Sequence, residues 1–186
     1  MRIYLPSTLA QLAALLPSGA LADPAATLLG PNAVAYAVTP ALREWYREGD
    51  LEELEYVALN HAARASLLLL AGEAGAGPAR RVVLAADVPD AATAPAPSDS
   101  AASDIAAVRL REAVTVSMLA AVHVDDPAIC DEVAAAAVGW AAVVGSAGAG
   151  DGGGDGGDDD ARFAVDSLDD HELQWYAVQE LPFLFS

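Results

Sequence analysis

The sequence has 186 residues and a formal net charge of -18, from 27 acidic residues against 9 basic ones, all of them arginine. A field of this sign repels phosphate groups and anionic lipid, so nucleic acid and membrane surfaces are excluded as expected partners. The single cysteine, Cys130, excludes an intramolecular disulfide and is typical of a reducing compartment, which predicts a cytoplasmic protein.

The first elements are a short strand and a capped helix. Residues 2–5 predict the strand, and Thr8 with Gln11 three positions later predicts a capping box that opens a helix over 9–16. Residues 33–38 alternate larger apolar side chains with alanine, which favours a strand that is packed on both faces.

Two further helix starts follow this strand. Thr39 with Pro40 combines a side-chain cap and a proline at the first helical position. Asp50 with Glu53 predicts a capping box for a longer helix over 51–71. Because its apolar positions cover most of the circumference, we expect this long helix to be embedded between other elements.

The middle of the chain predicts three strands and a loop. Residues 82–88 are apolar on both faces and are the candidate central strand. The segment 89–104 is rich in Pro, Ala, Ser and Asp, and we expect a flexible loop there. Residues 105–116 and 118–124 then alternate in the manner of strands.

The C-terminal third begins with another cap-plus-proline pair, Asp126 and Pro127, which predicts a helix to about Val144. The segment 145–160 is a low-complexity Gly/Asp-rich run, and we expect a flexible acidic loop. Residues 162–165 predict a short strand.

Asp169 with Glu172 predicts the start of a last helix that carries aromatic residues and ends at Pro182. The tail Phe183–Leu184–Phe185 is costly to leave in water. It therefore either closes the core or meets another chain, and we expect a protein partner or self-association through this C-terminal aromatic segment.

The predicted fold class is α/β or α+β, with residues 1–186 as a single domain. We expect a mixed sheet of about four to six strands with helices packed on it. In such sheets ligands gather beyond the carboxyl ends of the strands. The candidate pocket rim is therefore Thr8, Thr39, Asp87 and Asp125, which offers hydroxyls and carboxylates but no obvious base.

No catalytic, metal or phosphate-binding motif stands out. His123, Asp125 and His171 match the crude spacing of an iron-binding triad, but that chemistry requires a rigid framework unlike this alternation of strands and helices. The acidic run 151–160 lacks the ligand pattern of a calcium loop. We therefore expect no metal and no cofactor.

A polar set on the long helix is interpreted as a helix-surface ladder rather than as a catalytic set. Its members are Glu53, Tyr56, Asn60, His61 and Arg64.

Several stretches resemble a family of small uncharacterised actinobacterial proteins. They are residues 39–46, 52–56, 82–89, 121–126 and 171–176. The resemblance covers nearly the whole chain apart from the two low-complexity loops. It implies a bacterial, cytosolic setting and carries over no activity, cofactor or partner.

The leading hypothesis is a non-enzymatic cytosolic protein that acts through protein contacts. Self-association into a homo-oligomer is one form of this hypothesis. The hypothesis rests on the missing catalytic constellation and on the aromatic C-terminus. The alternative is a small-molecule-binding protein or enzyme with its site at the strand-to-helix junctions.

Overall fold

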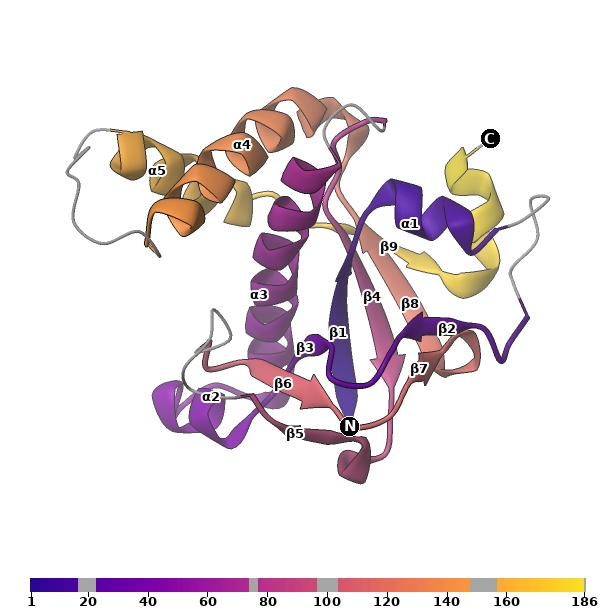
Figure 1. Cartoon of the computed structure of the whole chain (residues 1–186). Coiled ribbons are helices and arrows are strands. Elements are labelled where there is room, and N and C mark those ends of the chain that lie inside the picture. Colours follow the sequence, from indigo (N-terminus) through magenta and orange to yellow (C-terminus); the bar gives the residue numbers. More distant parts are fainter. Residues whose placement is uncertain (17–22, 74–76, 97–103, 148–156, 186) are drawn as a thin grey trace.

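The computed structural model describes residues 1–16, 23–73, 77–96, 104–147 and 157–185. These residues form a seven-stranded sheet and a small two-stranded sheet, with helices on both faces of the larger one (Figure 1). The strands are β1 (Arg2–Ser7), β2 (Thr27–Leu29), β3 (Val34–Ala37), β4 (Val82–Asp87), β5 (Thr93–Pro95), β6 (Ala107–Leu110), β7 (Val114–Thr115), β8 (Leu119–Val124) and β9 (Gln174–Ala177). The helices are α1 (Leu9–Ala14), α2 (Pro40–Trp45), α3 (Leu51–Gly72), α4 (Cys130–Ala147) and α5 (Gly157–Asp169). Short 3-10 helices are η2 (Asp90–Ala92), η3 (Val116–Met118), η4 (Pro127–Ile129) and η5 (Val178–Phe185).

The large sheet has the strand order β5-β6-β3-β1-β4-β8-β9, and every adjacent pair is antiparallel. The predicted mixed sheet of four to six strands is therefore wrong in strand direction and in number. The helix α3 does link two strands that run the same way, β3 and β4. However, β1 lies between them and pairs antiparallel with both, so no parallel neighbours result.

One face of the sheet packs against α1 and η5. Alternate residues of the central strands point to this face, including Ile3, Leu84 and Val122. From the covering elements, Leu12 and Leu181 are fully buried against them. This is the larger part of the core.

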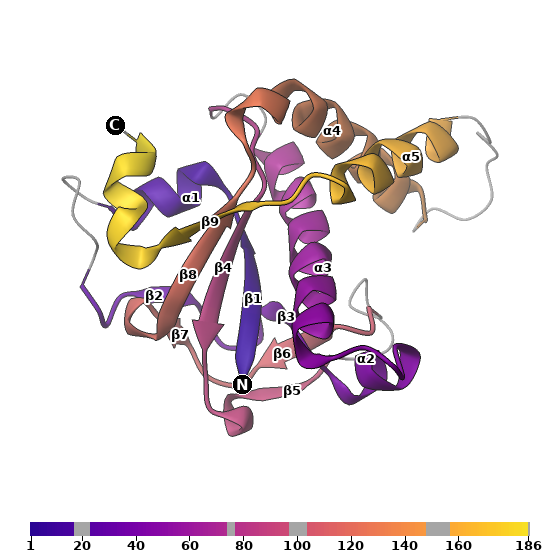
Figure 2. The ribbon, with the colours of Figure 1, turned by 180° about the vertical axis from the view of Figure 1, so that it is seen from behind.

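The opposite face carries α3, as the view from behind shows (Figure 2). Leu54, Ala58 and Ala62 of the helix are buried against a row of side chains that includes Tyr4 and Ala85. The helix packs on β1, β3 and β4, so the far edge of the sheet, β8 and β9, extends beyond it. The long helix is therefore buried, as expected, along the side that faces the sheet.

The C-terminal half of α3 also packs against α4 and α5, beyond the end of the sheet. Leu67, Val133 and Leu168 bring one buried side chain from each helix into this third cluster. By length and composition alone, residues 127–145 could cross a membrane. In the structure Val133, Ala136 and Ala137 of this stretch are buried against the neighbouring helices, whereas Val138 is 66 % exposed.

Four segments differ from their predicted structure. The predicted strand 162–165 lies within α5, and the predicted last helix is strand β9 followed by η5. Within the predicted loop 89–104, residues 93–95 form edge strand β5. Within the predicted loop 145–160, the first three residues belong to α4 and the last four to α5. Residues 97–103 and 148–156 lie outside the described residues.

Candidate functional site

The four residues of the predicted rim lie at two opposite ends of the sheet. Because β1 and β4 are antiparallel, Arg2 at the start of β1 pairs with Asp87 at the end of β4. Thr39 follows β3 at that same end, whereas Thr8 follows β1 and Asp125 follows β8 at the other end. Carboxyl ends meet at one edge only in parallel strands, so antiparallel pairing divides the set into two pairs.

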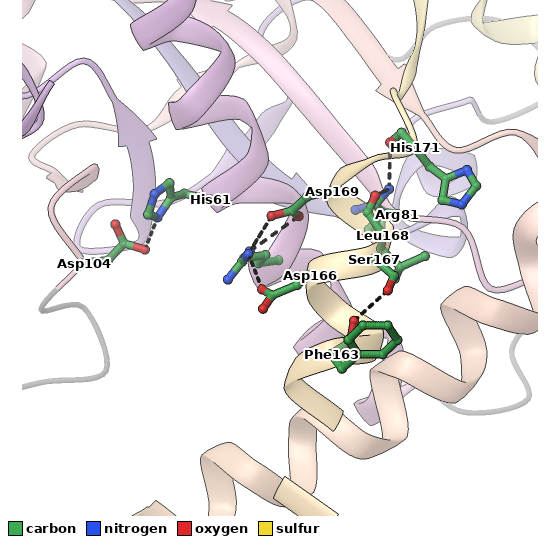
Figure 3. A network of polar contacts seen from close by, with 10 residues as sticks. His61, Arg81, Asp104, Phe163, Asp166, Ser167, Leu168, Asp169 and His171 are labelled. Carbon is green, nitrogen blue, oxygen red and sulfur yellow. Dashed lines mark hydrogen bonds and ion pairs between the residues drawn. The ribbon is translucent and has the colours of Figure 1, made fainter. Parts of the chain in front are cut away.

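Asp125 is completely buried and forms an ion pair with Arg81. The two side chains are 0 % and 1 % exposed, and Arg81 Nη2 lies 2.8 Å from Asp125 Oδ1. The same guanidinium donates to the carbonyl oxygens of Leu168 and His171, at 2.9 and 3.2 Å (Figure 3). Arg80 Nε donates to the backbone oxygen of Asp125. Arg81 therefore fixes the end of α5 and the following segment at the start of β4, and Asp125, which is engaged by Arg81, is closed to a ligand.

Arg64 of the predicted polar set links two helices. Its guanidinium on α3 lies 2.8 Å from Asp166 and 2.5 Å from Asp169 of α5. These hydrogen bonds raise the pKa of Arg64 against the opposing effect of burial. Arg64 thus stabilises the contact between helices, rather than forming a ladder along one helix.

His61 and Asp104 form a second polar contact, shown with the first in Figure 3. His61 Nδ1 lies 2.5 Å from Asp104 Oδ2, and the side chains are 28 % and 25 % exposed. Burial alone would raise the pKa of Asp104, but the hydrogen bonds from His61 and from the Ala106 N–H leave it below the usual value. The nearby Tyr36 ring has its pKa raised to about 12 by burial.

To activate a protein nucleophile, a histidine held by a carboxylate must lie within hydrogen-bond reach of a hydroxyl or thiol. Within the described part of the chain, no hydroxyl or thiol is hydrogen-bonded to His61. Asp104 instead ties the strand that begins at Ala107 to α3. The contact therefore links α3 to the segment that leads into β6.

The three residues with metal-triad spacing do not form a triad. Asp125 is occupied by Arg81, and His171 lies 3.6 Å from Glu132. Among the described residues, no group of three or more His, Cys, Asp or Glu side chains is placed to hold a metal ion.

Each of the two predicted threonines borders a cavity, but both hydroxyls are engaged. Thr8 lines a cavity of about 600 Å³ between α1 and α4, where its hydroxyl donates to Glu73 and accepts from the Gln11 N–H. Thr39 lines a cavity of about 610 Å³, and its hydroxyl donates to the backbone oxygen of Ile105 and accepts from the Leu42 N–H. Neither hydroxyl hydrogen is available to a ligand.

The C-terminal segment exposes three aromatic side chains, Trp175 on β9 and Phe183 and Phe185 on η5. Trp175 lies opposite His123 on the face that carries α3, but α3 stops short of β9, so the indole is 60 % exposed. Phe183 is 74 % exposed and Phe185 43 %, whereas Leu181 between them and β9 is fully buried. The aromatic C-terminus thus divides into buried anchors and exposed rings.

A second aromatic surface was missed by the sequence interpretation. The turn between α2 and α3 forms a hollow of about 970 Å³, here called the elbow hollow. Its lining includes Trp45, Tyr46, Tyr56, Arg47, Glu48, Glu52 and Glu53.

The three aromatic rings of the elbow hollow are exposed by 74 %, 43 % and 41 %. A signal was present in the sequence, since all three occur within twelve positions around a predicted helix start. Arg47 against the three glutamates gives the hollow a formal charge of -2.

A family model described as a family of unknown function matches residues 1–185. No curated protein and no solved structure matches the chain. The match confirms the resemblance to an uncharacterised family, while the actinobacterial origin stays a prediction.

Proposed function

Because the chain belongs to the family of unknown function DUF6912, we propose a function from its surfaces: a non-enzymatic cytoplasmic protein that binds a strand of another protein chain at β9. One observation carries the proposal. Strand β9 ends the seven-stranded sheet, and Trp175 on it is 60 % exposed.

An edge strand presents unpaired N–H and C=O groups to which a further strand can be added. The opposite edge, β5, is three residues long and ends in Pro95, which cannot donate a ladder hydrogen bond. Strand β9 has the sequence Gln-Trp-Tyr-Ala and contains neither a proline nor a charged residue. Of the two edges, β9 is thus the more open to pairing, and of its described residues only the last, Ala177, has its N–H engaged by a side chain, that of Glu180.

The surroundings of β9 supply apolar contact area for such a partner. Phe183 and Phe185 expose further aromatic area on η5, which covers the face of the sheet opposite to Trp175. Tryptophan and other aromatic residues are enriched in protein interfaces and contribute much of their binding energy.

A second copy of the chain is the simplest partner. Two antiparallel β9 strands related by a twofold axis would offer each other the same surface, which closes the assembly as a dimer. The large sheets of the two copies would then be continuous.

Light scattering after size-exclusion chromatography of the full chain, over a wide concentration range, tests this. We expect a mass above the monomer that W175K reduces to the monomer, because a charged side chain on an edge blocks strand addition. The control F163K changes a ring on α5 that is 74 % exposed and should leave the mass unchanged.

If the chain is monomeric throughout, a photo-crosslinker at position 175 must capture another protein from the native host. A monomer that yields no crosslinked partner would rule the proposal out, as would equal disruption by F163K.

The cavity beside Thr39 favours a second candidate, a small-molecule-binding protein. Its volume of about 610 Å³ is within the range of ligand pockets, and Val38, Ile105 and Val108 give it an apolar lining beside Asp104. Native mass spectrometry of the purified chain would detect a retained ligand. Loss of that ligand in V108W, with the fold intact by circular dichroism, would assign it to this cavity.

A further inference from the structure

We propose that the elbow hollow binds an arginine side chain presented by a partner protein. This inference concerns a different surface from β9 and does not depend on strand addition. It rests on three exposed aromatic rings and three carboxylates that line one hollow.

The aromatic rings fit a cation with a flat, weakly hydrated face. A guanidinium over the face of Trp or Tyr is attracted by the ring quadrupole and also stacks on it. Trp45 is 74 % exposed, and Tyr46 and Tyr56 are each more than 40 % exposed, so all three rings can be reached from solvent.

The carboxylates supply the complementary charge. The side chains of Glu48 and Glu52 have no hydrogen bond or ion pair with any described residue. One oxygen of Glu53 accepts from the Asp50 N–H, which leaves the other free. Arginine pairs with such carboxylates through two parallel hydrogen bonds, whereas the lysine ammonium acts as a point charge.

Local backbone structure forms the hollow before a ligand arrives. The Gly49 N–H donates to the Tyr46 oxygen at 3.2 Å and closes the turn. The Asp50 and Glu53 capping box then fixes the first turn of α3. A preformed site avoids part of the ordering cost of binding.

The occupant is a basic segment of a different protein, because the hollow carries a formal charge of -2 and this chain has only 9 basic residues against 27 acidic ones. A volume of about 970 Å³ also exceeds what one small cation needs. It suits a short segment with an arginine at its centre.

Isothermal titration of the full chain with the end-capped peptide Gly-Arg-Gly-Arg-Gly tests the proposal, with the Glu-for-Arg peptide as blank. Non-specific attraction of the peptide to an acidic protein depends on charge alone. The double variant W45A/Y56A keeps the charge and removes two rings, and we expect it to raise Kd about tenfold.

The matched control F163A removes an exposed ring on α5 and should change Kd by less than about twofold. E48Q/E52Q should weaken binding, and R47Q should strengthen it because it removes a positive charge from the lining of the hollow.

Two results would overturn the proposal. One is a Kd that is unaltered by W45A/Y56A, or that F163A raises as much, which would show charge attraction without a site. The other is tight binding of tetramethylammonium with none of the peptide, which would identify a small-cation site.

Discussion

The residue-scale contact between Arg81 and Asp125 places both charges out of water, with the side chains 1 % and 0 % exposed. Removing one partner of a buried pair leaves the other charge uncompensated. We therefore expect D125N to lower the free energy of unfolding by about 3 kcal/mol or more. Urea denaturation followed by circular dichroism measures this.

The surface pair of Arg2 with Asp87 is the control for that variant. Its side chains are 40 % and 59 % exposed, so D87N should cost well under about 1 kcal/mol. If D125N costs no more than D87N, the buried pair is not a main anchor of β8 and the α5 connection.

His123 predicts a pH dependence of stability. Burial of its ring lowers its pKa from 6.5, and the positive charge of Arg2 adds to the effect. Protonation therefore favours the unfolded chain, whose histidine keeps the ordinary pKa. This contribution is fully present above pH 6.5 and is lost as the pH falls from 6.5 through the lowered folded pKa.

The urea midpoint of unfolding, measured from about pH 8 to about pH 5, should decrease as the pH falls below 6.5. In H123Q the midpoint should depend less on pH. The lowered pKa values of Asp87 and Asp104 act below 3.8 and do not overlap with this pH range. H171Q, at a side chain 44 % exposed, serves as the control and should keep the slope. An equal slope in H123Q would contradict the assignment.

At the scale of elements, the helix starts could be predicted because a cap is a local contact. The Thr8 and Thr39 hydroxyls accept from backbone N–H groups three residues later, and Asp50 forms the complete capping box with Glu53. Each needs only its own few residues to form.

The C-terminal elements were predicted wrongly because tertiary contacts decide them. In α5, Ala161, Val165 and Leu168 are buried at helical spacing, but this signal is short and follows a glycine-rich run. Residues 174–177 carry no decisive period and become a strand because β8 offers an edge to pair with. Pairing over about fifty residues of sequence separation leaves no local trace.

The arrangement of the candidate site residues could not be predicted from the sequence either, because it also depends on tertiary contacts. The rim of Thr8, Thr39, Asp87 and Asp125 presupposed parallel neighbours, and strand direction depends on how the chain returns across β1. The docking role of the C-terminal aromatics stays a prediction. The sequence does contain a signal for the elbow hollow, the closely spaced Trp45, Tyr46 and Tyr56, but the sequence interpretation did not recognise it.

At the scale of the whole molecule, the two proposed surfaces lie far apart. The elbow hollow joins α2 to α3, whereas β9 is at the other side of the large sheet (Figure 1). A partner bound at one surface would therefore not block binding of a second partner at the other surface. With both surfaces occupied, the chain would connect two partners.

The net charge of -18 makes a further whole-molecule prediction, because unpaired carboxylates repel each other most when the chain is compact. Salt screens this repulsion, since the Debye length falls from roughly 30 Å at 0.01 M to roughly 8 Å at 0.15 M. Salt also weakens exposed pairs such as Arg64 with Asp166, but each of these contributes little. Calorimetry at pH 7 should therefore show Tm rising by a few degrees with sodium chloride. Near the isoelectric point of 4.1 the net charge vanishes, so the rise should vanish too. A Tm that falls with salt at pH 7, or rises equally at both pH values, would show that self-repulsion does not limit the stability of this fold.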